Sequence, residues 1–159
     1  MASSKDPQLA QIKLHPAVIV VGCLLVSIVA RQTWHLNLAP GILTVFRYLG
    51  IALEITGVAV LVMSYRSMAA AKTTIDPREH SSKVVTSALY AYSRNPIYLG
   101  WFLLIAGIGF RNASLLVLVM AATMVLLLYW AVILEEEAYL ERKFGEEYLR
   151  YKKSVRRWL

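Results

Sequence analysis

Long apolar runs separated by polar or charged residues dominate this 159-residue chain. The runs cover residues 16–30, 48–65, 96–110 and 113–134. A helix needs about 20 apolar residues to cross a bilayer, so the second and fourth runs are long enough and the other two need their flanking residues. Because lipid cannot hydrogen-bond to exposed backbone, runs of this length predict helices.

The connection between the third and fourth runs is very short. Only Arg111 and Asn112 separate them, so the two helices are predicted to form an antiparallel hairpin. We therefore expect an all-α fold, a polytopic membrane bundle of about four transmembrane helices followed by a cytoplasmic C-terminal amphipathic helix. In this interpretation residues 1–159 form a single integral membrane domain.

The composition and the distribution of charge agree with a membrane protein. The chain is 58% hydrophobic and 17% charged, whereas about a quarter of a soluble domain is charged. If the chain crosses four times with both termini in the cytoplasm, fourteen of its 17 Lys and Arg residues lie on the cytoplasmic side, as the positive-inside rule requires. The net charge of +7 is thus explained by anionic lipid headgroups. No recognition motif indicates nucleic acid.

The residues that often bind metals are few and scattered. Cys23 is the only cysteine, and it lies inside the first apolar run. His15, His35 and His80 lack the spacing of metal ligands, so we expect no metal. Glu54 lies in the middle of the second run, where an ionisable group suggests a functional role, although a structural polar contact explains it equally well.

The first segment with candidate functional residues covers residues 90–101. Asn95 suits an N-cap and Pro96 suits the first helical position, so the third helix is predicted to begin here. A helix N-terminus attracts a carboxylate or a phosphate, and Arg94 adds a guanidinium group beside it. Gly100 permits close approach by a ligand or by another helix. An ordinary capped membrane helix explains the same residues equally well.

The second segment is the charged tail that follows the fourth run. Apolar and aromatic residues recur after Glu136 every three or four positions, which predicts one face of a continuing helix. A carboxylate beside aromatic side chains can bind ribose hydroxyls or balance a cation. A basic amphipathic helix on the membrane surface is the alternative, and Gly145 leaves the continuity of the helix open. The recurring positions are Glu136, Leu140, Phe144, Tyr148, Tyr151 and Val155.

Taken in order, these two segments resemble the isoprenylcysteine carboxyl methyltransferase family and its bacterial relatives, and also the related phospholipid methyltransferases. The resemblance covers residues 73–159, and residues 73–77 are similar to the bacterial branch. It depends on Arg94-Asn95-Pro96-Ile97-Tyr98-Leu99-Gly100, on the hydrophobic hairpin, and on Glu136-Glu137 followed by Leu140, Phe144-Gly145, Tyr148 and Tyr151.

The resemblance implies an enzyme that depends on S-adenosylmethionine, with residues 73–159 as its cofactor-binding core. It assigns catalytic roles to Arg94, Asn95 and Tyr98. Eukaryotic carboxyl methyltransferases usually have His at the position of Asn95, which argues against specific prenylcysteine activity but not against methyl transfer in general. The implied cofactor-binding residues are Tyr90, Arg94, Asn95, Pro96, Tyr98, Leu99, Gly100, Glu136, Glu137, Tyr148 and Tyr151.

Four functions follow from these observations, and the sequence ranks them. The first is methyl transfer to the carboxyl group of a lipophilic acceptor, and the second is N-methylation of a lipid amine such as phosphatidylethanolamine. The third is an NADPH-dependent protein similar to sterol reductases, and the fourth is a non-catalytic membrane protein. The expected partners are a lipophilic small molecule or lipid substrate and the membrane lipids themselves. The expected location is the inner membrane of a bacterium.

Overall fold

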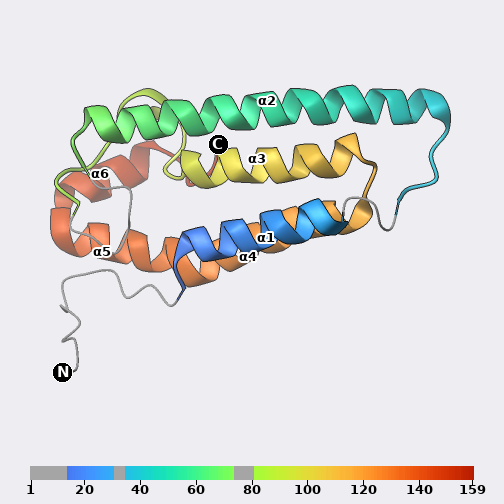
Figure 1. Ribbon diagram of the computed structural model, residues 1–159. Helices are drawn as coiled ribbons and strands as arrows, with labels where there is room; N and C mark the ends of the chain where they lie inside the picture. The colour runs from blue at the N-terminus through green and yellow to red at the C-terminus, as the bar shows by residue number, and fades with distance from the viewer. Residues whose placement is uncertain (1–13, 31–34, 74–80) are drawn as a thin grey trace.

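The computed structural model describes residues 14–30, 35–73 and 81–159, and these residues are helical for most of their length. The long helices lie side by side, and successive ones run in opposite directions along the chain (Figure 1). This arrangement confirms the predicted all-helical class. The elements in chain order are α1 (Pro16–Ala30), α2 (Pro40–Ala70), the 3₁₀ helix η1 (Ala88–Ala91), α3 (Pro96–Arg111), α4 (Leu115–Leu128), the π-helix η2 (Tyr129–Ile133), α5 (Leu134–Phe144) and α6 (Glu146–Ser154).

Two of the described helices are long and apolar enough to cross a membrane. They are α2 and the continuous helix Leu115–Phe144, which joins α4, η2 and α5. Only 17% and 33% of their most apolar windows are buried, whereas the core helix of a soluble protein is mostly buried. α2 begins at Pro40, earlier than the apolar run predicted, because a proline at the first position is compatible with a helix.

α2 and α3 approach each other closely through glycines. A Cβ atom on Gly57 would lie 2.8 Å from the Gly100 carbonyl oxygen, and one on Gly107 would lie 2.7 Å from the Gly50 carbonyl oxygen. Real Cβ atoms do not come so near to backbone, so these positions require glycine if the two helices are to keep their spacing. Small residues at such contacts are typical of helices that pack inside membranes.

The buried apolar core of the bundle lies between α1, α3 and α4. Its members include Ile105, Val117, Met124, Leu128 and Val132, each fully buried. The outward faces of the helices are apolar as well: Val29 is 80% exposed and Ile55 is 65% exposed. A soluble monomer rarely exposes such extended apolar faces, so the outer surface is suited to lipid.

The helix that carries the acidic run does not continue straight to the C-terminus. A π-helical turn, η2, precedes the acidic residues, and nothing in the apolar pattern predicted it. Gly145 then adopts φ +52°, which L-residues rarely adopt, and ends α5. The helix continues past the glutamates as predicted but ends at Phe144, so the continuity through Gly145 that the sequence left open is interrupted, and the aromatic positions divide between α5 and α6.

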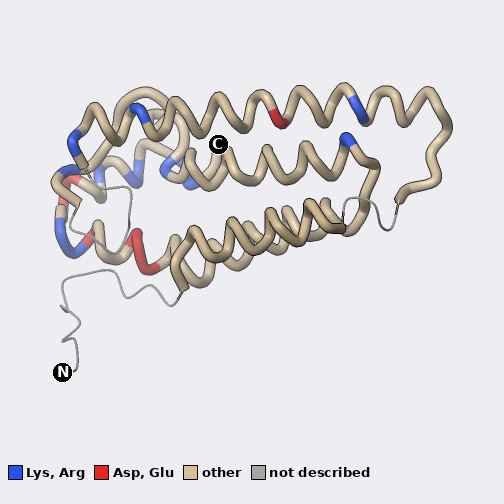
Figure 2. Tube along the Cα trace, viewed as in Figure 1, with Lys and Arg blue, Asp and Glu red and all other residues tan. Residues whose placement is uncertain are grey.

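Charged residues gather at one end of the bundle. Figure 2 shows Lys, Arg, Asp and Glu around α5, α6 and the C-terminal end of α2, while the rods between the ends carry few charges. Glu54 of α2 is one of these few, and it accepts a hydrogen bond from Arg111 Nε at 2.7 Å. Of the two explanations for Glu54, the described contacts support a structural polar pair between α2 and the end of α3.

Candidate functional site

The start of α3 and the acidic segment of α5 meet at the charged end of the molecule. Pro96 is the first residue of α3, as predicted, and Asn95 is its N-cap residue. The Asn95 side chain does not cap the helix, which corrects our expectation. It donates a hydrogen bond from Nδ2 to the Arg157 carbonyl oxygen at 3.2 Å, so it connects the helix start to the C-terminal tail.

Two cavities at this end are lined by both Arg94 and Glu136, and the larger of these two has a volume of about 360 Å³ and lies between α1, α2, α3 and α5. Ligand pockets commonly have volumes of about 300–1,000 Å³. Its polar wall is formed by Arg94, Asn95, Tyr98 and Glu136, all of which the sequence predicted as site residues. Its apolar wall comes from the first turns of α1 and from Trp101 of α3.

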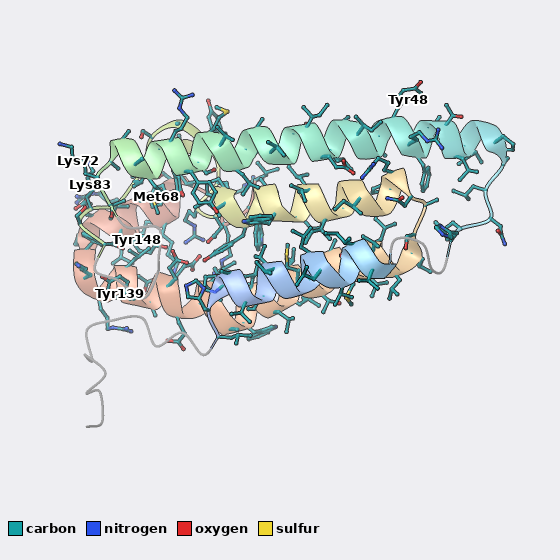
Figure 3. All side chains as sticks on the ribbon, in the orientation of Figure 1. Tyr48, Met68, Lys72, Lys83, Tyr139 and Tyr148 are labelled. Carbon is teal, nitrogen blue, oxygen red and sulfur yellow. The ribbon has the colours of Figure 1, made fainter. Side chains whose placement is uncertain are left out.

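A smaller cavity of about 60 Å³ adjoins the larger one. Both are lined by Met68, Tyr90, Arg94, Asn95 and Glu136, so the two cavities lie against the same side chains, and together they are called the recess. Residues 83–85 and the residues of α5 and α6 complete the smaller cavity. Met68, Lys83 and Tyr148, which line the smaller cavity, lie at one end of the bundle in Figure 3, whereas Tyr48 lies at the opposite end of α2.

The two adjacent glutamates of α5 have different surroundings. Glu136 lines both cavities, and its Oε2 accepts a hydrogen bond from the Tyr98 hydroxyl at 3.2 Å. Glu137 has a side chain only 7% exposed and accepts hydrogen bonds from Arg157 on both of its oxygens. Glu136 is therefore the carboxylate available to a ligand, whereas both oxygens of Glu137 already accept hydrogen bonds from Arg157.

Arg94 is the cation of the cavity wall. Its side chain is 8% exposed, and its Nη1 lies 3.2 Å from Glu137 Oε1. Neither Nε nor Nη1 makes a well-formed hydrogen bond with the described residues. Unsatisfied buried donors are costly, so their presence on a cavity wall indicates a place for an anionic group.

Three tyrosines support the smaller cavity. The Tyr151 hydroxyl donates a hydrogen bond to the Tyr90 carbonyl oxygen at 2.7 Å, which ties α6 to η1. The Tyr148 ring lies against that of Tyr151, with their centroids 6.0 Å apart. Burial is the main cause that raises the pKa of Tyr90, Tyr148 and Tyr151 well above the ordinary value. These hydroxyls therefore stay protonated at neutral pH.

Some predicted site residues lie elsewhere. Leu99 and Gly100 are not among the residues that line the two cavities. Gly100 contacts Gly57 and Leu61 of α2, and Leu99 lines an apolar groove beside Trp158. Helical geometry explains this, because successive residues of α3 point in different directions. Of residues 73–77, only Thr73 belongs to the described part of the chain.

Sequence reasoning missed the contribution of the first two helices. His15, Pro16, Tyr65 and Met68 line the larger cavity, although they lie outside both motifs. Their local pattern is that of ordinary apolar helices, so only the packing of α1 and α2 against α3 reveals them. Among residues 14–30, 35–73 and 81–159, no group of three or more His, Cys, Asp and Glu side chains could hold a metal ion.

The fold and the site together define a helical bundle with membrane-length helices and a polar-to-apolar recess at its charged end. A model of the phospholipid methyltransferase family matches residues 45–147, well over half of the sequence. The chain belongs to this family.

Similar proteins of known sequence agree with this assignment. The protein-S-isoprenylcysteine O-methyltransferases of Mus musculus and Homo sapiens are each 40% identical over 72 residues, which cover 45% of this chain and 25% of theirs. An uncharacterized protein of Haemophilus influenzae is 70% identical over 27 residues, 17% of this chain and 43% of its own length. Each match covers less than half of the relative.

Proposed function

We propose that this chain is an S-adenosylmethionine-dependent methyltransferase of the membrane that transfers a methyl group to a lipophilic acceptor. The observation that carries the proposal is the pairing of Arg94 with Glu136 on the walls of one recess. An anionic and a cationic group of the same ligand can each find an opposite charge there. The family membership supports the same activity.

The lining chemistry fits the cofactor. The free donors of Arg94 suit the carboxylate of its methionine part, and the Glu136 carboxylate suits ribose hydroxyls or the positive sulfonium. Tyr90, Tyr148 and Tyr151 offer aromatic surface for the nucleoside end. Glu137 is a weaker candidate for ribose, because Arg157 takes up both of its oxygens.

The apolar part of the recess supports a lipophilic acceptor. Ala17, Val20 and Val21 of α1 face Ile97 and Trp101 of α3 across the larger cavity. These side chains shelter a hydrocarbon chain from water and leave the polar wall to the reacting group. An acceptor held in this way reaches the methyl donor from the side of the bilayer, while the cofactor comes from the charged end.

Bound S-adenosylmethionine supplies a methyl group on a positively charged sulfur, which an acceptor can displace directly. The protein then holds the two reactants in line and excludes water. Tyr98 fixes Glu136 through its hydroxyl, and Arg94 anchors the anionic end of the donor. A carboxylate acceptor is ionised at neutral pH and needs no general base, in agreement with an amide, Asn95, at the start of α3.

Carboxyl O-methylation is our first choice of reaction, because the named relatives are protein-S-isoprenylcysteine O-methyltransferases. N-methylation of a phosphatidylethanolamine-type lipid is the alternative, because the family is that of phospholipid methyltransferases. An amine acceptor has to lose a proton, and Glu136 is a carboxylate beside the reaction space. Both comparisons favour methyl transfer over the NADPH-dependent and non-catalytic alternatives.

We also propose that the chain crosses the membrane four times with both termini in the cytoplasm. The alternating directions of α1, α2, α3 and α4 support this topology (Figure 1). The gathering of basic residues at one end supports the same orientation (Figure 2). α1 and α3 are 15 and 16 residues long, so their flanking residues complete the crossing.

A methyl-transfer assay on the purified full chain in lipid nanodiscs tests this proposal. Labelled S-adenosylmethionine is supplied with either a prenylcysteine analogue or phosphatidylethanolamine. We expect label in the prenylcysteine analogue, and a loss of at least about tenfold in Arg94→Gln but not in Arg111→Gln, because Arg111 is the last residue of α3 and the recess lies at the start of that helix. Label only in phosphatidylethanolamine favours the alternative acceptor, and no label in either contradicts the proposal.

A further inference from the structure

The C-terminal tail contacts the candidate site at several points. The backbone N–H of Arg94 donates to the Arg156 carbonyl oxygen at 3.0 Å. The Ser93 hydroxyl and the Asn95 amide both donate to the Arg157 carbonyl oxygen, at 3.3 Å and 3.2 Å. The tail thereby holds the residues that precede α3. The matched family region ends at residue 147, so it does not include these tail residues.

Glu137 is the centre of the ionic contacts that the tail completes. Arg157 donates from Nε to Oε1 and from Nη2 to Oε2, both at 2.9 Å. This bidentate geometry is the strongest form of an arginine–carboxylate pair. Arg94 Nη1 lies 3.2 Å from the same Oε1, and Lys152 Nζ lies 3.9 Å from Oε2.

The two arginines make unequal use of this carboxylate. Arg157 takes both oxygens with well-formed hydrogen bonds, and the hydrogen bond to Glu137 is the main cause that raises the pKa of Arg157 further above its already high value. Arg94 is the more deeply buried, yet its Nε and Nη1 lack hydrogen-bond partners among the described residues. Two guanidinium groups cannot both be bidentate to one carboxylate in this geometry.

We propose that Arg157 is a positioning residue that occupies Glu137 and so leaves the donors of Arg94 available to the anionic end of the ligand. This inference rests on the proposed function, because it assigns that anionic end to the cofactor. Without Arg157, the Glu137 carboxylate loses two charge-assisted hydrogen bonds, and the nearest remaining guanidinium is that of Arg94. The guanidinium of Arg94 then donates its hydrogen bonds to Glu137, and these donors are no longer available to a ligand in the recess.

The affinities for two ligands distinguish a positioning role of Arg157 from a purely structural one. S-adenosylhomocysteine carries the amino-acid carboxylate, and 5′-methylthioadenosine has the same nucleoside without it. Loss of the Arg94 donors weakens only the first ligand, whereas distortion of the whole recess weakens both. The matched control is Arg156→Ala. Arg156 is an exposed neighbour, and its substitution removes the same charge while its backbone carbonyl keeps the hydrogen bond from Arg94.

Calorimetric titration of the full chain in detergent provides the test. In Arg157→Ala the Kd for S-adenosylhomocysteine is expected to rise about tenfold, the effect of losing one charge-assisted contact, while the Kd for 5′-methylthioadenosine changes less than about twofold. In Arg156→Ala neither Kd changes. Arg157→Lys keeps the charge but not the bidentate contact, and it is expected to show an intermediate, equally selective loss.

The outcomes separate the two proposals. A wild-type chain that binds neither ligand contradicts the proposed function and, with it, this inference. A wild-type chain that binds S-adenosylhomocysteine while Arg157→Ala binds it equally well overturns the positioning role alone. Equal weakening of both ligands also overturns it, because the tail would then only support the recess. If Arg157→Ala does not fold, the selectivity measured in Arg157→Lys decides the same question.

Discussion

The apolar shaft of this bundle and its charged end are stabilised in different ways. In the shaft, α2 and α3 pack through glycines, and α1, α3 and α4 share a buried aliphatic core. At the charged end, a single carboxylate, Glu137, joins α5, the start of α3 and the C-terminal tail. The shaft is therefore stabilised by close packing of glycines and aliphatic side chains, whereas the charged end depends on a few ionic groups that each contact several partners.

Removal of the Glu137 carboxylate should have the largest effect. Glu137→Ala leaves the buried Arg94 and the partly buried Arg157 without their shared anion, which is expected to destabilise the fold by about 3–5 kcal/mol. Thermal and denaturant unfolding in detergent, followed by circular dichroism, measures this change. The control is Glu135→Ala in the same acidic run, which should cost less than about 1 kcal/mol. Equal losses in the two variants would show that the charged end is not organised around Glu137.

A large side chain in the glycine contact should have the next largest effect. Gly57→Leu places atoms where the α3 backbone lies, and the separation of the helices is expected to cost about 2–3 kcal/mol. Gly22→Leu is the matched control, because a Cβ atom on Gly22 meets nothing within 4 Å. The same unfolding measurement applies. A neutral Gly57→Leu would mean that α2 and α3 do not pack as closely as described.

The turn between α5 and α6 gives a smaller effect. Gly145 has φ +52°, so Gly145→Ala is expected to cost about 1–2 kcal/mol through backbone strain alone. Gly41→Ala serves as control, because Gly41 lies in α2 and has open space around its Cβ position. Unfolding in detergent reports the stability, and a gain in helical signal with Gly145→Ala would contradict a fixed break at this residue.

The ion pair of the shaft should contribute least. Glu54 and Arg111 have side chains 25% and 39% exposed, and pairs with such exposure contribute about 0.2–1 kcal/mol in water. Glu54→Gln is therefore expected to change the unfolding free energy in detergent by less than about 1 kcal/mol, with no change in ligand affinity. A loss similar to that of Glu137→Ala would remove the contrast between the two regions.

The sequence predicted the shaft well, because a long apolar run in lipid has to satisfy its backbone hydrogen bonds internally and therefore forms a helix. The limits of α1 and α3 and the tight hairpin at Asn112 follow directly from the pattern. The conformation of Gly145 and the π-helical turn η2 could not be derived, because they depend on how the last helix packs.

The candidate site was predicted in part. Arg94, Asn95 and Glu136 meet as the ordered motifs suggested, although they lie far apart along the chain. The different surroundings of Glu136 and Glu137 were not predicted, because two adjacent glutamates carry the same local signal. The partner that distinguishes them, Arg157, lies in a tail whose charge pattern also fits simple attraction to headgroups.

The central claim is that the start of α3 and Glu136 of α5 bind one nucleoside ligand together. Calorimetric titration with S-adenosylhomocysteine of the wild type, of Glu136→Gln and of Glu54→Gln tests it most directly, because both variants remove one carboxylate with almost no change in volume. We predict measurable binding by the wild type, a Kd at least about tenfold higher in Glu136→Gln, and an unchanged Kd in Glu54→Gln. The absence of binding by the wild type, or equal affinities in all three proteins, would contradict the account.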